Sequence, residues 1–171
     1  MDVSVIMVSY NTRDMLREAL HSLAEHTTGV EYEVIVVDNA SEDGSVEMLR
    51  TEFPDVMVVQ SGGNLGFGRA NNLGFEVARG KYLFLLNTDT LLLGNAVALL
   101  RDHLDNHPEV GACGGNLCRK NGAPAFSYGR LPQRKDILYQ FVPAFLGRSG
   151  AKKITAGTIP QNRWDMSPGP I

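Results

Sequence analysis

Asn87, Thr88 and Asp89 place three oxygen-bearing side chains in one turn, directly after a run of large apolar residues at 83–86. Because this run is too short for a helix and is bounded by glycines, we interpret it as a buried parallel strand. Ligands of open α/β sheets bind beyond the carboxyl ends of the strands. A carboxylate at that position can hold a hard divalent cation, which in turn neutralises a diphosphate. The alternative interpretation is that Asp89 caps the helix that follows.

Three more polar clusters follow predicted strands, at residues 9–11, residues 38–39 and the glycine-rich loop 61–68. If the sheet is parallel, all four clusters lie along one edge, and a ligand that spans them has the size of a nucleotide. Asp38 suits a base or a ribose, because an ionised carboxylate only accepts hydrogen bonds. The glycines allow close approach of the backbone, and the start of the next helix offers free N–H groups to a phosphate.

Each of these residues also has a purely structural interpretation. Asp38 can cap a helix, Asn64 can stabilise a turn, and the glycines can serve only as loop positions. Arg69 and Arg79 can be solvated surface charges. The alignment of four clusters by one topology favours a binding site over four separate structural roles.

The elements that position these clusters follow from the apolar pattern. Continuous apolar runs predict strands at 3–8, 33–37, 56–59 and 83–86. Apolar residues at helical spacing predict a helix after each strand, and the inward positions expected on the first three are Leu16, Ala19, Leu20, Leu23, Val46, Leu49, Phe53, Ala70, Leu73 and Val77. This alternation predicts an α/β fold with a mostly parallel, twisted sheet and helices on both faces, in the manner of a Rossmann-like nucleotide-binding half.

Polar residues and glycines mark the ends of these helices. Asn11 or Thr12 is expected to cap the first helix and Ser41 the second, and Gly80 is expected to end the third. A fourth helix is predicted at about 95–106.

The pattern becomes weaker after the fourth helix. A strand is predicted at 110–117, and the Asn121-Gly122 pair predicts a hairpin turn into residues 125–127. An amphipathic helix is expected at 136–146, followed by residues without a sustained period.

Composition limits the classes of protein that fit. The 171 residues, 43% hydrophobic and 20% charged, amount to one globular domain with a core, and a net charge of −3 gives no footprint for nucleic acid. No apolar run approaches the roughly 18 residues of a membrane helix, and the start lacks the basic segment of a secretory signal. We expect a cytoplasmic protein, with peripheral membrane contact left open. Cys113 and Cys118 lack nearby histidines and make a poor zinc site.

A dinucleotide-binding domain is the obvious rival, and it requires G-x-G-x-x-G directly after the first strand. The first turn here, residues 9–12, contains no glycine, and the glycine loop follows the third strand instead. Gly66 and Gly68 are followed by Asn71 where the pattern needs its third glycine. Because the G-x-G-x-x-G pattern is not met, a nicotinamide cofactor is not expected. The P-loop pattern is absent from the sequence as well.

Several segments together resemble the inverting family-2 glycosyltransferases of the GT-A fold, and most closely their rhamnosyltransferase-like branch. The main ones are residues 3–11, 36–45 and 64–74. Residues 85–89 fall where that family keeps its Asp-x-Asp-type motif, and residues 106–111 extend the match. This ordered set covers the first two-thirds of the chain and is far more specific than a lone Asp-x-Asp.

The resemblance implies a metal-assisted, inverting transfer of a sugar from a dTDP- or UDP-linked donor to a hydroxyl of a glycan or lipid-linked acceptor. It implies that Asp38 hydrogen-bonds the base and that Asp89 ligates Mg²⁺ or Mn²⁺ at the diphosphate, where the metal stabilises the leaving group. A carboxylate must also act as general base for the acceptor hydroxyl. The residues that the resemblance places at the nucleotide-sugar are Ser9, Tyr10, Asn11, Asp38, Asn64, Gly66, Arg69, Asn71, Asn87, Thr88 and Asp89.

The sequence departs from the family pattern in three places. Asn87 occupies the first acidic position of the metal motif, which leaves one carboxylate fewer. Asn71 stands where many members have Arg, a role that Arg69 could take over. The only carboxylates after residue 110 are Asp136 and Asp165, and neither has the acidic neighbour expected of the catalytic base.

We therefore expect a C-terminally truncated glycosyltransferase, with a nucleotide-sugar-binding core at 1–128 and an incomplete acceptor-side region at 129–171. The base is then missing, or Asp165 or a partner chain supplies it. The alternatives are a binding module without turnover and an inactive, poorly folded fragment. We expect rhamnose or another deoxysugar as the sugar and surface-polysaccharide assembly at the inner membrane face as the setting. An exposed apolar surface would favour a homodimer.

Overall fold

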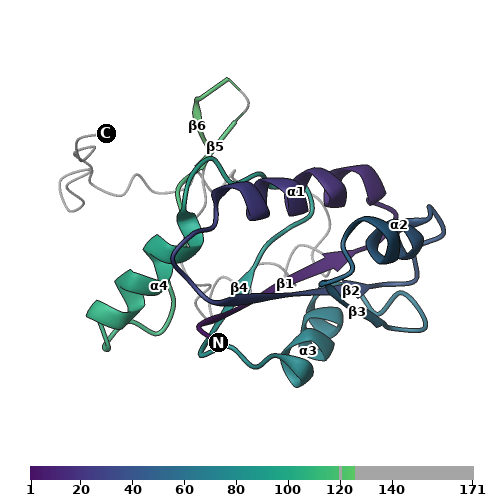
Figure 1. Ribbon diagram of the computed structural model, residues 1–171, viewed down its shortest axis with the longest axis horizontal. Coiled ribbons are helices and arrows are strands. Elements are labelled where there is room, and N and C mark those ends of the chain that lie inside the picture. Colours follow the sequence, from purple (N-terminus) through teal and green to yellow (C-terminus); the bar gives the residue numbers. More distant parts are fainter. Residues whose placement is uncertain (120, 126–171) are drawn as a thin grey trace, which may run out of the picture. The chain divides into compact units, whose positions relative to one another are not determined.

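The computed structural model describes residues 1–119 and 121–125, all of which belong to one compact unit, Met1–Ser127. Strands and helices alternate along the chain (Figure 1): β1 (Val3–Ser9), α1 (Arg13–His26), β2 (Tyr32–Asp38), α2 (Ser45–Glu52), β3 (Met57–Gln60), α3 (Phe67–Val77), β4 (Tyr82–Leu85) and α4 (Ala96–Asn106). A two-stranded antiparallel hairpin of β5 (Leu117–Cys118) and β6 (Pro124–Ala125) follows.

The first four strands form one parallel sheet in the order β3-β2-β1-β4. Helices cover both faces, with α1 on one side of the sheet and α3 on the other (Figure 1). On the α1 side, leucines of α1 and α2 and Val97 of α4 pack against Val3, Val5 and Met7 of β1. On the α3 side, Ala70 packs with Ile6 and Ile35. The α/β fold predicted from the sequence is therefore confirmed.

The central strands explain why their sequences are nearly continuous in apolar residues. Both faces of β1 are covered, and Val3, Val5, Ile6 and Met7 are each 2% exposed or less. A strand that is buried on both faces has no solvent side on which polar residues would alternate. The apolar stripe predicted for α1 is buried as expected, at Leu16, Ala19, Leu20 and Leu23.

β4 is parallel, as predicted, but the prediction that it is buried is wrong. Leu83 is 48% exposed and Leu85 is 47% exposed. In the described part of the chain β4 pairs only with β1, which makes it an edge strand. The helix on that face, α3, packs over β1 and β2, so the two leucines lie beyond its cover.

Two helix boundaries differ from the prediction. Ser41 does not cap α2, because the helix begins at Ser45 after Gly44, whose φ of 82° suits glycine. Gly80 does not end α3, because the helix ends at Val77 and its C-cap residue is Ala78.

The structure also differs from the prediction at two helix residues expected to face inward and at one expected strand. Val77 is 37% exposed, and α3 instead turns Gly74 toward the sheet, where an added Cβ would meet Ile6 Cγ2 at 2.6 Å. Met48 is buried on α2 in place of Val46, which is half-buried. Of the predicted strand 110–117 only Leu117 lies in a strand, at the start of β5. The predicted helix at 136–146 lies outside the described residues.

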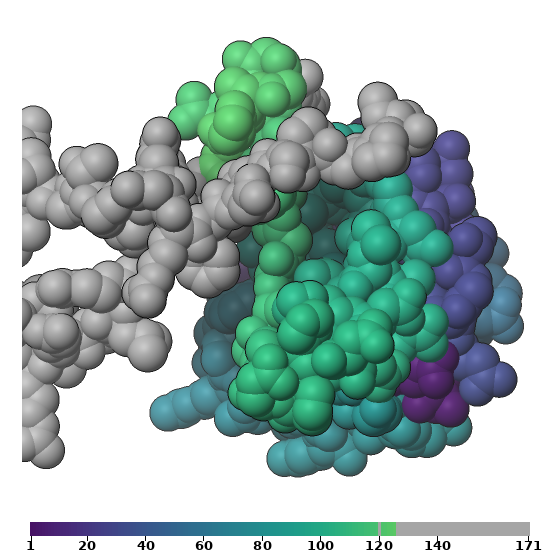
Figure 2. All heavy atoms as spheres, turned by 90° about the vertical axis from the view of Figure 1, so that its left-hand side faces the viewer, coloured from purple at the N-terminus to yellow at the C-terminus, as the bar shows by residue number. Residues whose placement is uncertain are grey.

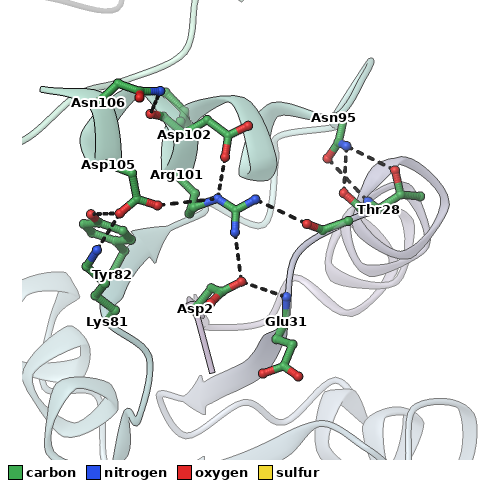
Figure 3. Close-up of polar contacts among 12 residues, drawn as sticks. Asp2, Thr28, Glu31, Lys81, Tyr82, Asn95, Arg101, Asp102, Asp105 and Asn106 are labelled. Carbon is green, nitrogen blue, oxygen red and sulfur yellow. Dashed lines mark hydrogen bonds and ion pairs between the residues drawn. The ribbon is translucent and has the colours of Figure 1, made fainter.

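A polar cluster at the amino ends of the strands fixes α4 (Figure 3). Arg101 donates to Asp2 Oδ2 at 2.9 Å and to the Gly29 carbonyl at 3.2 Å, and Asp105 accepts from the Tyr82 hydroxyl at 2.8 Å. Figure 2 shows α4 on the surface with the N-terminal residues beside it. These polar groups form hydrogen bonds and ion pairs with one another at the edge of the sheet opposite to the polar strand ends, so we assign the cluster a structural role. None of the described helices has the length and apolar character needed to cross a membrane.

Candidate functional site

The carboxyl ends of the strands bring the polar clusters to one edge of the sheet. Ser9 of β1 is the register partner of Asp38 in β2, and Asp38 is the partner of Gln60 in β3. The Leu86 amide donates to the Ile6 carbonyl at 3.0 Å, which carries the pairing of β4 one residue further. The four clusters that follow these strands therefore share one edge, the edge where open α/β sheets bind ligands.

Asp38 is the buried acid of this edge. Its residue is 2% exposed, and its Oδ2 accepts a hydrogen bond from the Ser41 amide at 3.1 Å. Its Oδ1 is buried and has no hydrogen-bond partner among the described residues. A buried acceptor without a donor is unfavourable, so such groups call for a specific explanation. A ligand that offers an N–H or O–H to Oδ1 would supply one.

The glycine-rich loop is held by two asparagines. The Asn39 amide group donates to Asn64 Oδ1 at 2.9 Å, and Asn39 Oδ1 accepts from the Leu65 amide at 2.9 Å. Asn64 Oδ1 also accepts from the Gly66 amide at 3.0 Å. Asn64 therefore has the turn-stabilising contacts of its structural interpretation. Asn39 is 3% exposed and organises the loop, a role that the local sequence did not indicate.

The start of α3 keeps its amide groups available. Gly66 precedes the helix with a φ of 76°, and no side chain of residues 1–119 or 121–125 caps the first turn. Free N–H groups at a helix start attract anions. The Arg69 side chain is exposed and makes no polar contact with another described residue. Asn71 is 4% exposed and donates to the Phe67 carbonyl at 2.9 Å, so its amide group is used within the helix.

The end of β1 and the loop after it contribute an exposed ring at Tyr10, a buried hydroxyl at Ser9 and an exposed amide at Asn11. Tyr10 is 47% exposed. Ser9 is fully buried, and its hydroxyl lies 3.1 Å from the Thr12 hydroxyl. Asn11 adopts a φ of 54°, and its Oδ1 accepts from the Glu42 amide at 2.8 Å. Thr12 occupies the N-cap position of α1, as predicted, but neither its side chain nor that of Asn11 makes a capping hydrogen bond.

The residue that caps α1 is Asp43, which the sequence analysis did not single out as a site residue. Its Oδ2 accepts from the Arg13 amide at 2.8 Å, and its Oδ1 accepts from the Ser45 amide at 3.0 Å and the Ser45 hydroxyl at 2.5 Å. Burial would raise the pKa of Asp43, but the hydrogen bonds from Ser45 and Arg13 outweigh it and hold the pKa below its usual value. Its place two residues before the start of α2 is a local signal for the contacts with Ser45, but not for the contact with Arg13.

Asn87, Thr88 and Asp89 form the turn after β4, in which the Thr90 amide donates to the Asn87 carbonyl at 3.2 Å. Thr88 is 9% exposed, and Asn87 and Asp89 are exposed. The alternative that Asp89 caps the next helix is wrong, because α4 begins only at Ala96, after Asn95.

The oxygen ligands of this turn fit a hard divalent cation that is shared with a substrate. Within the described residues no group of three or more His, Cys, Asp or Glu side chains gathers, so they form no all-protein cage. Mg²⁺ is usually bound by one or two carboxylates together with phosphate oxygens and water. One exposed carboxylate, Asp89, beside the Asn87 amide matches that mode of binding.

Comparison with known proteins identifies the family. Residues 4–163 match the family profile described as Glycosyl transferase family 2. An uncharacterized glycosyltransferase of Bacillus subtilis, YfnE, is 33% identical over 118 residues, which are 67% of this chain and 30% of that protein.

Solved structures give the same fold. TarS of S. aureus, residues 1–349 in complex with UDP, superposes with a TM-score of 0.58 at 27% identity over 63% of this chain and 33% of that one. The mannosyltransferase PcManGT of Pyrobaculum calidifontis, in complex with GDP-Man and Mn²⁺, gives a TM-score of 0.51 at 27% identity over 56% of this chain and 30% of that one. The chain thus spans about a third of the length of these relatives. By its sequence match and its GT-A-type fold, the chain belongs to glycosyl transferase family 2, as its motifs indicated.

Proposed function

We propose that this chain forms the donor side of a glycosyltransferase that moves a sugar from a nucleoside-diphosphate sugar to a hydroxyl acceptor with inversion. The observation that carries the proposal is the buried Oδ1 of Asp38 at the carboxyl edge of the sheet, which has no hydrogen-bond partner in the described part of the chain. Uracil and thymine each present one ring N–H, which matches a single acceptor oxygen. We therefore expect a UDP- or dTDP-linked donor, and rhamnose or another deoxysugar remains the proposed sugar.

Different residues of the site are proposed to bind the base, the diphosphate and the metal of the donor. Asp38 accepts from the base, and the exposed ring of Tyr10 lies in the neighbouring loop. The uncapped start of α3 and the side chain of Arg69 face no competing described partner and suit the diphosphate. Asp89 and Asn87 would hold the Mg²⁺ or Mn²⁺, which stabilises the charge of the departing nucleoside diphosphate.

The second part of the proposal concerns the catalytic base and the acceptor. Of the acids at the described edge, Asp38, Asp43 and Asp89 have the separate roles given above, while Asp14 and Glu42 precede the metal turn in the chain. Because the family resemblance expects the base after the metal turn, we seek it in residues outside the described part, in a longer protein of which this chain is a piece, or in a partner chain. For the acceptor side we propose peripheral membrane association and a homodimer.

Calorimetric titration tests the donor site. The purified chain is titrated with UDP, dTDP and GDP, each with and without Mn²⁺, and the series is repeated with Asp38→Asn and Asp89→Ala. We expect UDP or dTDP to bind better than GDP, Asp38→Asn to weaken binding at least about tenfold, and Asp89→Ala to remove the metal dependence. Asp55→Asn, an exposed acid away from the site, is the matched control. Absence of nucleotide binding by the unmodified chain would refute the proposal.

Transfer assays separate the enzyme from the binding module. Nucleotide binding together with turnover of a UDP- or dTDP-sugar supports a transferase. Metal-dependent binding without turnover supports a module that lacks the base.

A further inference from the structure

The loops after β1 and β2 are joined by hydrogen bonds between residues that lie about thirty positions apart in the sequence. The Asn11 amide donates to Ser41 Oγ at 3.0 Å, and the Glu42 amide donates to Asn11 Oδ1 at 2.8 Å. Further along, the Arg13 amide donates to Asp43 Oδ2 at 2.8 Å, and Arg13 Nη1 donates to the Asp43 carbonyl at 3.2 Å. We call these five residues the cross-loop clasp.

The clasp reaches Asp38 through Ser41. The hydroxyl of Ser41 accepts from the Asn11 amide, while the amide of the same residue donates to Asp38 Oδ2 at 3.1 Å. This contact occupies Oδ2 and leaves Oδ1 without a partner among the described residues. The position of Ser41 therefore decides which oxygen of Asp38 is left for a ligand.

The backbone between Asp38 and Ser41 does not favour its observed conformation by itself. Ala40 has a φ of 69°, in the left-handed region that residues with a Cβ rarely adopt. Such a conformation persists when surrounding contacts over-determine it. Asn11 supplies two such contacts, one to each of the residues that follow Ala40.

We propose that Asn11 is a positioning residue that fixes Ser41 and thereby keeps Oδ1 of Asp38 directed to the donor base, rather than a residue that contacts the nucleotide. Its side-chain oxygen accepts from the Glu42 amide, which is the contact that supports a positioning role. The inference rests on the proposed nucleotide-binding function.

An ion pair between α1 and α2, the helices that follow these two loops, provides a matched control. Arg17 of α1 donates to Glu52 of α2 through Nε at 2.8 Å and Nη2 at 3.0 Å. This ion pair joins α1 to α2 as the clasp does, but it makes no contact with Ser41 or Asp38. Loss of Arg17 removes this ion pair and a contact with Asp14, and it reports what weaker helix packing does to nucleotide affinity while the contacts of Ser41 and Asp38 are retained.

The variants separate the side chain of Asn11 from its backbone. Asn11→Gly removes the side chain and still accepts a φ of 54° without strain. Asn11→Asp keeps an acceptor oxygen for the Glu42 amide and tolerates the same backbone conformation. Ser41→Ala retains the amide that bonds Asp38 and removes only the hydroxyl that accepts from Asn11.

UDP affinity is measured by calorimetry for each variant at a temperature where all of them are folded, together with the thermal midpoint and the exchange rate of the Glu42 amide. We expect Asn11→Gly to weaken UDP binding about three- to tenfold and to speed exchange of that amide, since one orienting hydrogen bond is lost. Asn11→Asp should restore the affinity, Ser41→Ala should weaken it, and Arg17→Ala should lower the midpoint with unchanged affinity.

An Asn11→Gly variant that loses stability but binds UDP as tightly as the unmodified chain overturns the inference and leaves the proposed function standing. An Asn11→Asp variant that binds no better than Asn11→Gly overturns it as well. If the unmodified chain binds no nucleotide at all, the proposed function fails and the inference falls with it.

Discussion

Ser9 and Asp38 are register partners at the carboxyl ends of β1 and β2, the two central strands of the sheet. Ser9 is fully buried, and Asp38 is 2% exposed. Two polar side chains thus meet at a buried position where the parallel strands end and their loops diverge. The fold makes Asp38 a fixed acceptor of this edge, and burial of its carboxylate is unfavourable in the free protein.

Asp38→Asn should raise the stability of the free chain while it weakens nucleotide binding. The variant removes a buried charge, and its amide oxygen can still accept from the Ser41 amide, while an uncharged NH2 group replaces the oxygen that has no partner among the described residues. We expect the free energy of unfolding to rise by about 1 kcal/mol, measured by urea denaturation without nucleotide. Asp55→Asn should leave it unchanged. A loss of stability in Asp38→Asn would mean that the carboxylate stabilises the unliganded fold.

Asp89→Ala should leave the fold intact and change only the response to metal. Asp89 is exposed and makes no hydrogen bond with another described residue. Its removal should alter the free energy of unfolding by less than about 0.5 kcal/mol. UDP affinity should lose its dependence on Mn²⁺, measured by titration with the metal present and after chelation. Persistence of that dependence would place the metal on other ligands, and Asp55→Ala controls for the change in net charge.

Gly80→Ala should be one of the most damaging single substitutions in the chain. An added Cβ would collide with the Ser4 backbone nitrogen and meet the Val3 carbonyl carbon at 2.6 Å, and backbone atoms of a central strand cannot move aside. We expect a loss of about 2 to 3 kcal/mol, read from denaturant midpoints. Gly63→Ala is the control, because nothing lies within 4 Å of its added Cβ. Equal stability of the two variants would contradict the close approach at Gly80.

Glu33 should make stability depend on pH in the acid range. Its side chain is 8% exposed, and it accepts from the Ser4 hydroxyl at 2.6 Å, from the Arg79 amide at 2.8 Å and from Arg79 Nε at 2.9 Å. Burial alone would raise the pKa of Glu33, but the hydrogen bonds from Ser4 and Arg79 outweigh it and hold the pKa below its usual value.

Because the folded pKa of Glu33 is depressed, its contribution is present above the unfolded pKa of about 4.3 and is lost as the pH falls through the folded pKa. The free energy of unfolding should therefore fall between about pH 5 and pH 3, and it should fall less steeply in Glu33→Gln. Glu47→Gln, an exposed acid of α2, should retain the slope of the unmodified chain. Identical slopes for both variants would remove Glu33 from the acid response.

The sequence by itself determined the order of the elements and the edge at which polar residues gather. Apolar runs of strand length and helical periodicity are local signals, and right-handed crossovers leave few ways to arrange parallel strands. Asp38 and Asp89 could be placed beyond strand ends on those grounds alone. The GT-A fold and the family followed from the same ordered motifs.

The tertiary structure decided which of those polar residues are committed to the protein itself. The contacts of Asn11 with Ser41 and Glu42 and of Asp43 with Arg13 join residues far apart in sequence, and no local pattern encodes such pairings. Local preference predicted that Asn11 or Thr12 caps α1, and Thr12 does occupy the N-cap position. The carboxylate that accepts from the first amide of that helix is Asp43, because the packing of two neighbouring βα units brings it there.

Burial was decided in the same way. Leu83 and Leu85 have the composition of a buried strand, but the exposure of a strand depends on its place in the sheet, and β4 lies at the edge of the described one. Sequence periodicity reports which side chains share a face, whereas the neighbours that cover the face come from elsewhere in the chain.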